Sequence, residues 1–199
     1  MKSQFEIKDK SIINDILNKA EYGTLALCCD NKPYSVPINF VKIEANIYFH
    51  GGKKGKKMEF IKNNTLASFS VVEPYSMIQS YFSSTENLAC PATHFFKSII
   101  IDGDIQIVDK YDEKVLALES LMKKLQPEGK YKPLNDEVYK KVVDITEVFK
   151  LIPTELKGKI KLGQNLPKER FDMIVDHLEQ RGSDIDKLTV RDMLENKEQ

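Results

Sequence analysis

The feature that most constrains this chain is a succession of short segments dense in β-branched and aromatic residues, joined by turns of only a few residues. The first three segments, GTLALCC, PYSVPINFVKI and IYFHG, are separated by turns at Asp30–Asn31 and Glu44–Asn46. Such compositions are typical of strands, and antiparallel pairing follows because parallel strands need a much longer crossover. Three later segments, LASFSVV, FFKSIIIDGDIQIVD and VVDITEVFKLIP, predict three more strands.

Stretches with apolar residues at helical spacing flank these strands. They predict helices over residues 11–19, 56–64, 113–125, 135–142, 168–181 and 185–196. Residues 73–92 show no clean period and are long for a loop, which favours a functional or partner-covering segment. Six strands with short turns and few helices predict a small antiparallel barrel. The long fifth strand is expected to be broken near Asp102 and Gly103, where glycine permits a bulge or a sharp bend that curls the sheet.

Composition narrows the class of protein. A chain of 199 residues, 41% of them hydrophobic, is enough for one compact core. We expect one domain over residues 1–199, with a barrel in residues 22–155 and a C-terminal segment with helices in residues 156–199. Thirty basic residues balance thirty acidic ones, so no global field attracts nucleic acid. The sequence shows no signal peptide and no run of the ~18 apolar residues that a membrane span needs. Its three cysteines are poorly spaced for disulfides, as in a reducing compartment. We therefore expect the protein in the cytoplasm, away from membranes.

The segment HGGKKGKKMEF, residues 50–60, is the strongest candidate for chemistry. Its glycines let main-chain N–H groups approach a ligand, the following helix begins with partial positive charge, and its four lysines can neutralise a phosphate. It lacks the order of a Walker loop. The alternative is that Lys53, Lys54, Lys56 and Lys57 form a solvated turn and helix face.

A second unusual feature is Pro37, which lies inside the predicted strand PYSVPINF and cannot donate to a ladder. One interpretation is a bulge that exposes neighbouring backbone groups to the polar edge of a planar ring. The other is a proline on an edge strand, where it discourages aggregation. The sequence alone favours the edge strand.

No metal site is expected from the cysteines and histidines. Cys90 and His94 form one close pair, but no second pair accompanies them among Cys28, His50 and His177. Thr93 and Ser98 have no base with an orienting acid beside them, so a nucleophilic triad finds no support.

The segments GTLALCC, PYSVPINFV, IYFHGGKKGKKMEFI and THFFKSIIIDGDIQIV resemble, in this order, the pyridoxamine 5′-phosphate oxidase-like flavoproteins. The resemblance covers residues 22–165, and the tail LKGKIKLGQN is similar to that of the nitroimidazole-resistance branch. It implies a mainly β fold with flanking helices, a six-stranded antiparallel split β-barrel. It also implies FMN as the cofactor, bound at the interface of a homodimer.

The resemblance assigns roles residue by residue. The strand with Ser35, Val36, Pro37 and Asn39 would lie along the isoalloxazine ring, and His50 and Gly51 would line the ring and the ribityl chain. Lys53, Lys56 and Lys57 would hold the phosphate, and Thr93, Phe96 and Ser98 would close the site. Lys159, Lys161, Gln164 and Asn165 would reach the flavin of the same or the partner subunit. His50 is the one candidate for a catalytic role, as a group that stacks on the flavin or donates a hydrogen bond to it. The implied cofactor-binding residues are Ser35, Val36, Pro37, Asn39, His50, Gly51, Lys53, Lys56, Lys57, Thr93, Phe96, Ser98, Lys159, Lys161, Gln164 and Asn165.

The implied activity is an NAD(P)H-dependent oxidoreductase, a flavin reductase or nitroreductase-like enzyme that reduces a small-molecule acceptor. The chain lacks the arginine-rich phosphate strand and the C-terminal arginine and histidine pattern of true pyridoxamine phosphate oxidases, so vitamin B6 oxidation is not expected. Three alternatives stay open: a deazaflavin in place of FMN, a non-catalytic FMN- or haem-binding protein with His50 or His94 as axial ligand, and a partner-binding protein with an empty barrel.

Overall fold

The computed structural model describes residues 2–86 and 88–197, and its strands form one hydrogen-bonded sheet. Their order is β3-β2-β6-β7-β8-β5-β4, with β1 pairing with β8, and the pairs β1–β8, β2–β3, β2–β6, β4–β5 and β5–β8 are antiparallel. The predicted class, mainly β with flanking helices, is confirmed. The strands are β1 (Glu6–Ile7), β2 (Gly23–Cys29), β3 (Lys32–Ile38), β4 (Val41–Ile43), β5 (Asn46–Gly51), β6 (Leu66–Ile78), β7 (Thr93–Ile107) and β8 (Glu147–Lys161).

The helices connect and flank these strands. Two predicted helices at the C-terminal end, residues 168–181 and 185–196, are confirmed as α5 and α6. The α-helices are α1 (Lys10–Lys19), α2 (Lys56–Asn63), α3 (Tyr111–Leu125), α4 (Lys140–Ile145), α5 (Lys168–Arg181) and α6 (Asp184–Lys197). Short 3₁₀ turns are η1 (Ser3–Phe5), η2 (Ser80–Phe82) and η3 (Glu137–Tyr139). None of the helices in the described residues combines the length and the apolar content needed to cross a membrane.

The predicted number of strands, six, is wrong, because the described residues contain eight. The segment PYSVPINFVKI forms two strands rather than one: β3 ends at Ile38 and pairs with β2, whereas β4 starts at Val41 and pairs with β5. The eighth strand, β1, has only two residues, too few for any alternating pattern to reveal.

Three further expectations are corrected. β7 runs unbroken through Gly103, so this glycine does not end or interrupt a strand. Residues Val142–Ile145 belong to α4, and the last strand begins at Glu147 instead. Of the expected loop 73–92, the first residues continue β6 to Ile78 and Ser80–Phe82 form a 3₁₀ turn; residue 87 lies outside the described residues. The extension of β6 past Pro74 was not predicted because Glu73 and Pro74 are residues that strands disfavour.

The chain divides into two compact units. The central unit comprises Ser11–Val71 and Ile99–Lys157, and the C-terminal unit comprises the residues up to Lys10, Val72–Ser98 and the residues from Gly158 onward. Strands β6, β7 and β8 carry residues of both units. The predicted single domain over residues 1–199 requires that these two units assemble into one, and it stays a prediction.

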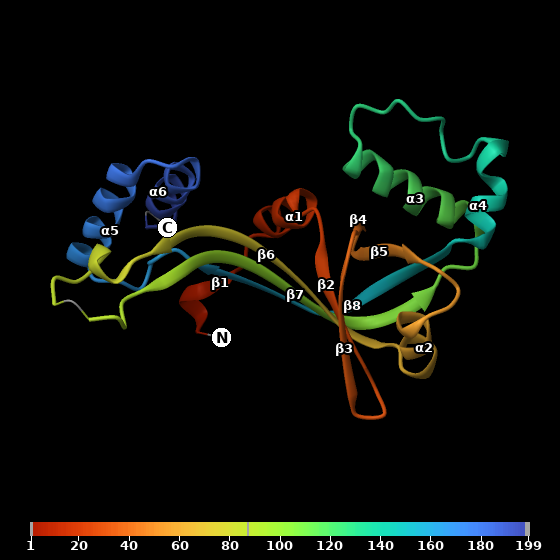
Figure 1. Ribbon diagram of the computed structural model, residues 1–199, viewed down its shortest axis with the longest axis horizontal. Helices are drawn as coiled ribbons and strands as arrows, with labels where there is room; N and C mark the ends of the chain where they lie inside the picture. Colours follow the sequence, from red (N-terminus) through yellow and green to blue (C-terminus); the bar gives the residue numbers. More distant parts are fainter. Residues whose placement is uncertain (1, 87, 198–199) are drawn as a thin grey trace. The chain divides into compact units, whose positions relative to one another are not determined.

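The core of the central unit is dense in aromatic side chains. Phe49 of β5 and Phe149 of β8 are register partners whose rings stack with centroids 5.0 Å apart, and Phe40 meets Phe69 edge to face at 4.8 Å. Helix α3 lies beside β4 and β5 (Figure 1), and its Ala117 belongs to a buried cluster with Tyr48 and Val148. Burial of these rings supplies the main stabilising free energy of the unit.

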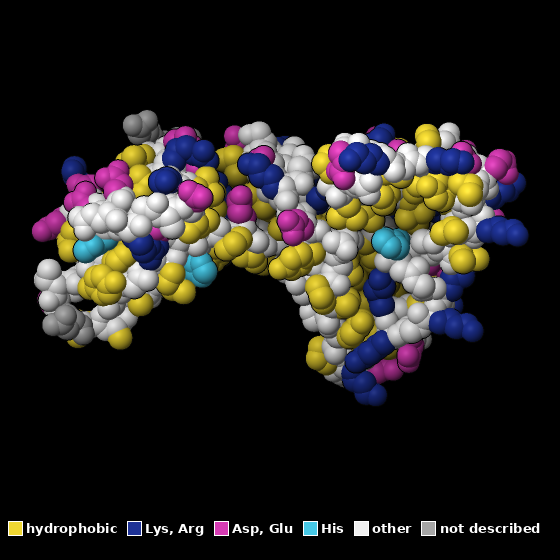
Figure 2. Space-filling view, turned by 45° about the horizontal axis from the view of Figure 1, so that its top comes forward, with side chains coloured by type: hydrophobic (Ala, Val, Ile, Leu, Met, Phe, Trp, Pro, Cys, Tyr) yellow, Lys and Arg dark blue, Asp and Glu magenta, His cyan; other side chains and the backbone are white. Residues whose placement is uncertain are grey.

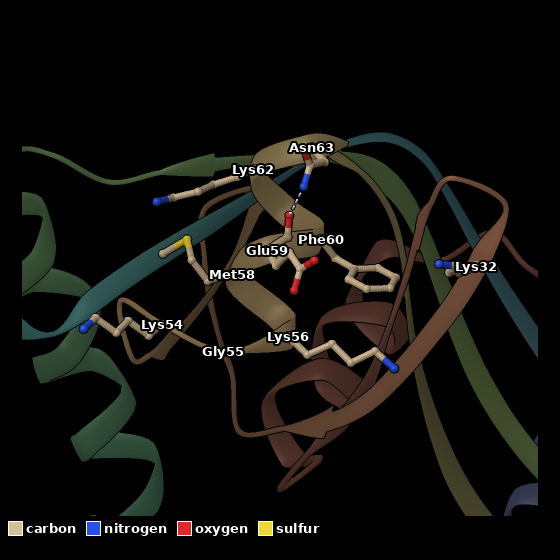
Figure 3. Close-up of a pocket in the computed structure, with 9 residues that line it drawn as sticks. All are labelled: Lys32, Lys54, Gly55, Lys56, Met58, Glu59, Phe60, Lys62 and Asn63. Carbon is tan, nitrogen blue, oxygen red and sulfur yellow. Dashed lines mark hydrogen bonds between the residues drawn. The ribbon is translucent and has the colours of Figure 1, made fainter.

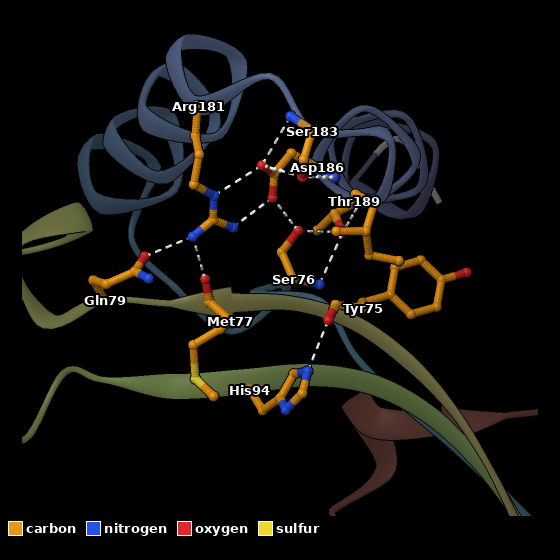
Figure 4. Close-up of polar contacts among 10 residues, drawn as sticks. Tyr75, Ser76, Met77, Gln79, His94, Arg181, Ser183, Asp186 and Thr189 are labelled. Atoms are coloured by element: carbon orange, nitrogen blue, oxygen red, sulfur yellow. Dashed lines mark hydrogen bonds and ion pairs between the residues drawn. The ribbon is translucent and has the colours of Figure 1, made fainter.

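In the C-terminal unit, α5 and α6 pack together and a buried polar network joins α6 to β6 (Figure 4). Ser76 Oγ donates to Asp186 Oδ1 over 2.5 Å, and Arg181 Nε donates to Asp186 Oδ2 over 2.8 Å. Arg181 also donates to the Met77 carbonyl oxygen over 3.0 Å. Because the carboxylate of Asp186 is fully buried, these donors are what allow it to be charged there.

Candidate functional site

The predicted cofactor-binding residues divide between the two units, and each group forms its own local constellation. Nine lie in the central unit, from Ser35 to Lys57, and seven lie in the C-terminal unit, from Thr93 to Asn165.

In the central unit, the predicted ring-binding residues Ser35, Val36 and Pro37 lie on a strand with an open side. β3 stands at the end of the strand order, so its second edge has no strand partner within the described part of the chain. Its register with β2 is continuous from Gly23↔Ile38 to Cys29↔Lys32. The edge-strand interpretation of Pro37 is therefore confirmed and the bulge interpretation is wrong. Backbone groups on the open edge are available to a ligand.

Asn39 follows directly after this strand and has a partner within the fold. Its amide nitrogen donates to the Glu21 carbonyl oxygen over 3.0 Å. The bond holds the chain where it leaves β3 for β4. The amide oxygen of Asn39 remains available as an acceptor.

The centre of the group is the contact between Lys57 and the end of β5. Lys57 Nζ donates to the carbonyl oxygen of His50 over 3.1 Å and lies 5.4 and 5.6 Å from the ring centroids of Phe49 and Phe149. Burial lowers the pKa of the Lys57 ammonium below its usual range. Within the described residues no carboxylate pairs with it, so it is a half-buried cation without a counter-ion.

Gly51 makes this arrangement possible. A Cβ atom at Gly51 would lie 2.7 Å from Lys57 Nζ and 3.0 Å from its Cε, so a larger residue would push the ammonium group away. His50 precedes it with an exposed side chain. The pKa of the His50 imidazole is lowered, first because neighbouring protein atoms hinder its hydration and then because of the Lys57 charge. Near neutral pH this ring is therefore predominantly neutral.

The first two lysines of helix α2, Lys56 and Lys57, point in different directions. It begins after Gly55, whose φ of 108° is one that L-residues rarely adopt. Lys56 Nζ lies 4.8 Å from the centroid of the Tyr34 ring on β3 and 5.5 Å from that of Phe60. The structure thus places Lys57 at β5 and Lys56 at β3. The third predicted phosphate ligand, Lys53, is exposed in the turn before the helix.

A hollow with a volume of about 830 Å³ lies along α2 (Figure 3). It is lined by Lys32, Lys54, Gly55, Lys56, Met58, Glu59, Phe60, Lys62 and Asn63. The predicted site residues His50, Gly51 and Lys57 do not line it. Sequence reasoning missed Lys32 and Lys62, because nothing in the local pattern places Lys32 beside a helix that starts more than twenty residues later.

In the C-terminal unit, two lysines of β8 meet residues of β7. Lys161 Nζ donates to the hydroxyl of Thr93, and Lys159 Nζ lies 5.3 Å from the centroid of the Phe96 ring. Burial, and then the charge of Lys159, lower the pKa of Lys161. Four of the predicted residues are therefore gathered into one basic and aromatic group.

The other three predicted residues of this unit have separate environments. Gln164 uses its amide within the fold: its Oε1 accepts from the backbone N–H of Leu162 over 2.8 Å, and its Nε2 donates to the Ile160 carbonyl oxygen over 3.0 Å. Ser98 is buried and Asn165 is exposed. A role for these three residues in cofactor binding stays a prediction.

The histidines and cysteines form no metal site that can be recognised: the described residues contain no group of three or more His, Cys, Asp or Glu that could hold a metal ion. His94 Nε2 lies 2.7 Å from the Tyr75 carbonyl oxygen, and His177 stacks on Phe82 with centroids 4.7 Å apart. Both rings therefore have contacts within the fold.

The residues of the central unit fit a phosphorylated planar cofactor. Lys57 supplies a cation that has no counter-ion among residues 2–86 and 88–197, Gly51 leaves the backbone beside it accessible, and the edge of β3 offers main-chain donors and acceptors. These are the groups that a phosphate and the polar edge of a heterocyclic ring require.

Comparisons with known proteins bear on both the family and the fold. A family model described as pyridoxamine 5′-phosphate oxidase matches residues 9–160. Comparison with curated proteins gives no significant match. Among solved structures, the chain is similar to a protein described as a 5-nitroimidazole antibiotic resistance protein from Bacteroides thetaiotaomicron, with a TM-score of 0.64 and 21% identity over 78% of this chain and 86% of that one.

Two further structures are similar in fold. The FAD and heme binding protein from Mycobacterium smegmatis has a TM-score of 0.65 and 18% identity over 78% of this chain and 73% of that one. A flavocytochrome from Azotobacter vinelandii has a TM-score of 0.66 and 17% identity over 84% and 74%. At these identities the likeness shows the fold, whereas the family model covers most of the chain. The chain therefore belongs to the pyridoxamine 5′-phosphate oxidase family.

Proposed function

We propose that this chain is a flavoprotein that binds FMN and, as a homodimer, uses NAD(P)H to reduce a small-molecule acceptor. Support comes from its family and from the solved structures it resembles, two of which are named as an FAD and heme binding protein and a flavocytochrome. The observation that carries the proposal is the half-buried Lys57 ammonium, held beside Gly51 without a carboxylate partner among the described residues.

The residues of the central unit have distinct roles in this proposal. Lys57 binds the phosphate, with Lys53 and Lys56 adding positive charge around it. The open edge of β3, at Ser35–Pro37, hydrogen-bonds the polar edge of the isoalloxazine ring. His50, neutral at physiological pH, lines the ring and can donate a hydrogen bond without adding charge.

The C-terminal unit carries its own group of proposed flavin-binding residues, which serve the flavin of the same chain or of the partner copy. Lys159 and Lys161 lie with Phe96 and Thr93 in one group whose cations and aromatic ring suit an anionic planar ligand. A bound flavin supplies the hydride chemistry. The residues of the chain bind it, orient it, exclude water from it and stabilise negative charge with Lys57 and with backbone donors. Vitamin B6 oxidation is not proposed, because the sequence lacks the arginines that such enzymes use.

The decisive experiment is the visible spectrum of the purified chain after incubation with FMN and removal of the excess, followed by anaerobic addition of NADH or NADPH. We expect retained flavin absorption that bleaches with one of the nucleotides. Flavin that stays oxidised with both donors would contradict the reductase but keep the flavoprotein. A colourless protein would refute flavin binding, and a deazaflavin would be recognised by its different absorption maximum.

A second candidate function is a non-catalytic FMN- or haem-binding protein. The printed names of the two similar structures, which include haem and cytochrome, favour it. Of the two histidines considered as axial ligands, His50 has an exposed side chain, whereas His94 Nε2 already contacts the Tyr75 carbonyl oxygen. A Soret band that is lost in the variant His50→Ala would support this candidate.

The homodimer has its own test. Light scattering of the flavin-loaded chain is expected to give twice the mass of 22.9 kDa. A monomer that retains flavin with full affinity would refute a site shared between subunits.

A further inference from the structure

Helix α3 has a groove on the face opposite to the one that packs in the core of the central unit. The packed face carries Ala117 and Leu121, which join a buried cluster with Tyr48 of β5. The groove has a volume of about 450 Å³, and none of the proposed flavin-binding residues lines it. Its lining includes Tyr111, Asp112, Val115, Leu116 and Glu119, which recur at helical spacing on one face of α3, and Pro133 across from them.

The second wall of this groove is the segment after α3, residues 126–136, which runs back along the helix toward α4 (Figure 1). Glu119 holds this segment, because its Oε2 accepts a hydrogen bond from the backbone N–H of Leu134 over 2.9 Å. The side chain of Glu119 is only 23% exposed. Its carboxylate therefore has a fixed position at the wall, which lowers the cost of ordering a site there.

The middle of the groove is apolar. Leu116, one turn from both Asp112 and Glu119, is 53% exposed, and Val115 and Pro133 line the groove beside it. In the space-filling view, yellow side chains gather over the part of the central unit that carries α3 and α4 (Figure 2). An apolar surface of this kind between polar groups is typical of sites for small organic ligands.

The charge of the groove is negative at both ends. Within the described part of the chain, the charged residues that line it are Asp112, which is exposed, and Glu119. Lys123 lies 3.8 Å from Glu119 but is 70% exposed, so it compensates that carboxylate only weakly. Lys132, beside the second wall, pairs with Asp136 instead.

We propose that this groove is a binding site for a linear aliphatic diamine. Asp112 and Glu119 are seven residues apart on one face of α3, which separates their Cα atoms by about 10 Å along the helix. When each carboxylate holds one ammonium group, roughly four to six methylene groups span the remaining distance and cover Leu116. The negative lining repels phosphates, so this site is separate from the flavin site and does not rest on the proposed function.

The test titrates the isotope-labelled full-length chain with cadaverine, a five-carbon diamine, and follows the backbone amide signals by NMR. We expect the largest shifts in α3 and in residues 126–136. Pentylamine has the same carbon chain but one ammonium group, and we expect it to bind at least roughly fivefold more weakly. Glutarate, which carries carboxylates at both ends of the chain, is expected not to bind, and added salt weakens cadaverine binding by screening.

Two variants test the carboxylates. Glu119→Gln removes one charge but keeps an amide oxygen for the N–H group of Leu134, so the second wall stays in place. We expect Glu119→Gln and Asp112→Asn each to bind cadaverine no more tightly than wild type binds pentylamine, and the double variant to lose at least roughly tenfold. The matched control is Asp144→Asn, which removes an exposed carboxylate of α4 outside the groove and should stay within about twofold of wild type.

A third variant tests the apolar middle of the groove. Leu116→Ser is expected to weaken cadaverine and pentylamine by the same factor, because both place their carbon chain on this side chain. Leu125→Ser is its control, since Leu125 is 47% exposed on the same helix but does not line the groove. The unfolding midpoints of all variants are compared, so that a loss of folding is not taken for a loss of binding.

Four results would overturn the proposal: no binding of cadaverine at about 10 mM, equal affinities for cadaverine and pentylamine, equal cadaverine binding by wild type and the double variant, or displacement of cadaverine by FMN. The last would place the groove inside the flavin site. Failure of the proposed function is a different result, because a chain that retains no flavin can still bind cadaverine in a carboxylate-dependent way.

Discussion

The ammonium nitrogen of Lys57 lies 3.1 Å from the carbonyl oxygen of His50, at the place where a side chain on Gly51 would have to stand. This relationship links a residue of α2 to the end of β5 and leaves a cation beside an accessible stretch of backbone. The identity of residue 51 therefore controls where the charge lies.

The variant Gly51→Ala tests whether this cation binds the cofactor. An added methyl group would meet Lys57 Nζ at 2.7 Å, and because this is the end of a flexible side chain, the lysine moves rather than the backbone. We expect the FMN dissociation constant to rise roughly tenfold, about 1.4 kcal/mol, with little change in the unfolding midpoint. The affinity is measured by flavin fluorescence quenching.

Gly52→Ala is the matched control for this variant. The nearest atom to a Cβ at Gly52 is the Lys54 carbonyl oxygen at 3.8 Å, an ordinary contact. This variant should bind FMN like wild type. Equal affinities for Gly51→Ala and wild type would show that the position of Lys57 does not matter for FMN.

A second glycine is required for stability rather than for binding. A Cβ at Gly103 of β7 would lie 2.1 Å from the Ile152 carbonyl oxygen and 3.1 Å from the Pro153 Cα of β8, both of them backbone atoms that cannot rotate away. We expect Gly103→Ala to lower the free energy of unfolding by about 3 kcal/mol, measured by urea denaturation. Gly52→Ala again serves as the control, and a loss below 0.5 kcal/mol for Gly103→Ala, on the order of a neutral surface change, would contradict this account.

Local sequence pattern was sufficient for much of the fold. Strands β2 and β5, the two C-terminal helices and the edge position of Pro37 follow from alternation, helical spacing and the missing N–H of proline, which depend on neighbouring residues only. The family was recognisable from the order of such segments. The glycines of residues 50–60 mark the region where Lys57 contacts the end of β5, and cofactor binding there stays a prediction.

The features that escaped prediction depend on contacts between distant segments. The strand was expected to break near Gly103, but it is continuous there, and the missing side chain lets the backbone of β8 approach, which no local pattern reveals. The opposite directions of Lys56 and Lys57 depend on Tyr34 and Phe149, which lie far away in the sequence. The contact of Ser76 with Asp186 joins residues 110 positions apart.

This last contact gives a prediction about acid stability. Asp186 is fully buried and accepts hydrogen bonds from Arg181, Ser183 and Ser76, which hold the pKa of its carboxyl far below the usual range. The unfolded chain takes up this proton near pH 3.8 whereas the folded chain does not, so the stabilisation is complete above that pH and is lost as the pH falls below it. We expect Asp186→Asn to cost about 3 kcal/mol at pH 7, with a difference from wild type that shrinks toward pH 2.

Asp184→Asn is the matched control, because Asp184 lies at the start of the same helix with a fully exposed side chain. It should change the unfolding free energy by less than about 0.5 kcal/mol at either pH. Urea denaturation at pH 7, 4 and 2.5 gives the comparison. A difference between Asp186→Asn and wild type that stays constant over this range would exclude the charged carboxylate as its cause.

Lys124 of α3 gives a prediction in the opposite pH range. Its Nζ donates to the carbonyl oxygen of Leu17 at the end of α1 over 3.0 Å and lies 3.8 Å from the centroid of the Phe40 ring. Burial lowers the pKa of Lys124 from 10.5 to about 8. Between these two values the unfolded chain holds a proton that the folded chain has released, so the free energy of unfolding rises with pH, by up to about 1.4 kcal/mol per pH unit.

The measurement is urea denaturation of wild type, Lys124→Met and the control Lys123→Met, whose side chain is 70% exposed. Tyr48 and Tyr75 have raised pKa values and therefore reduce stability above pH 10, so the comparison is made between pH 8 and 9.5. We expect a steeper rise in wild type and in Lys123→Met than in Lys124→Met, which keeps only the contributions of other lysines with lowered pKa values, such as Lys57 and Lys161. Parallel profiles for all three proteins would mean that the charge of Lys124 does not change across this pH range. Its burial between α1 and Phe40 would then not govern its protonation there.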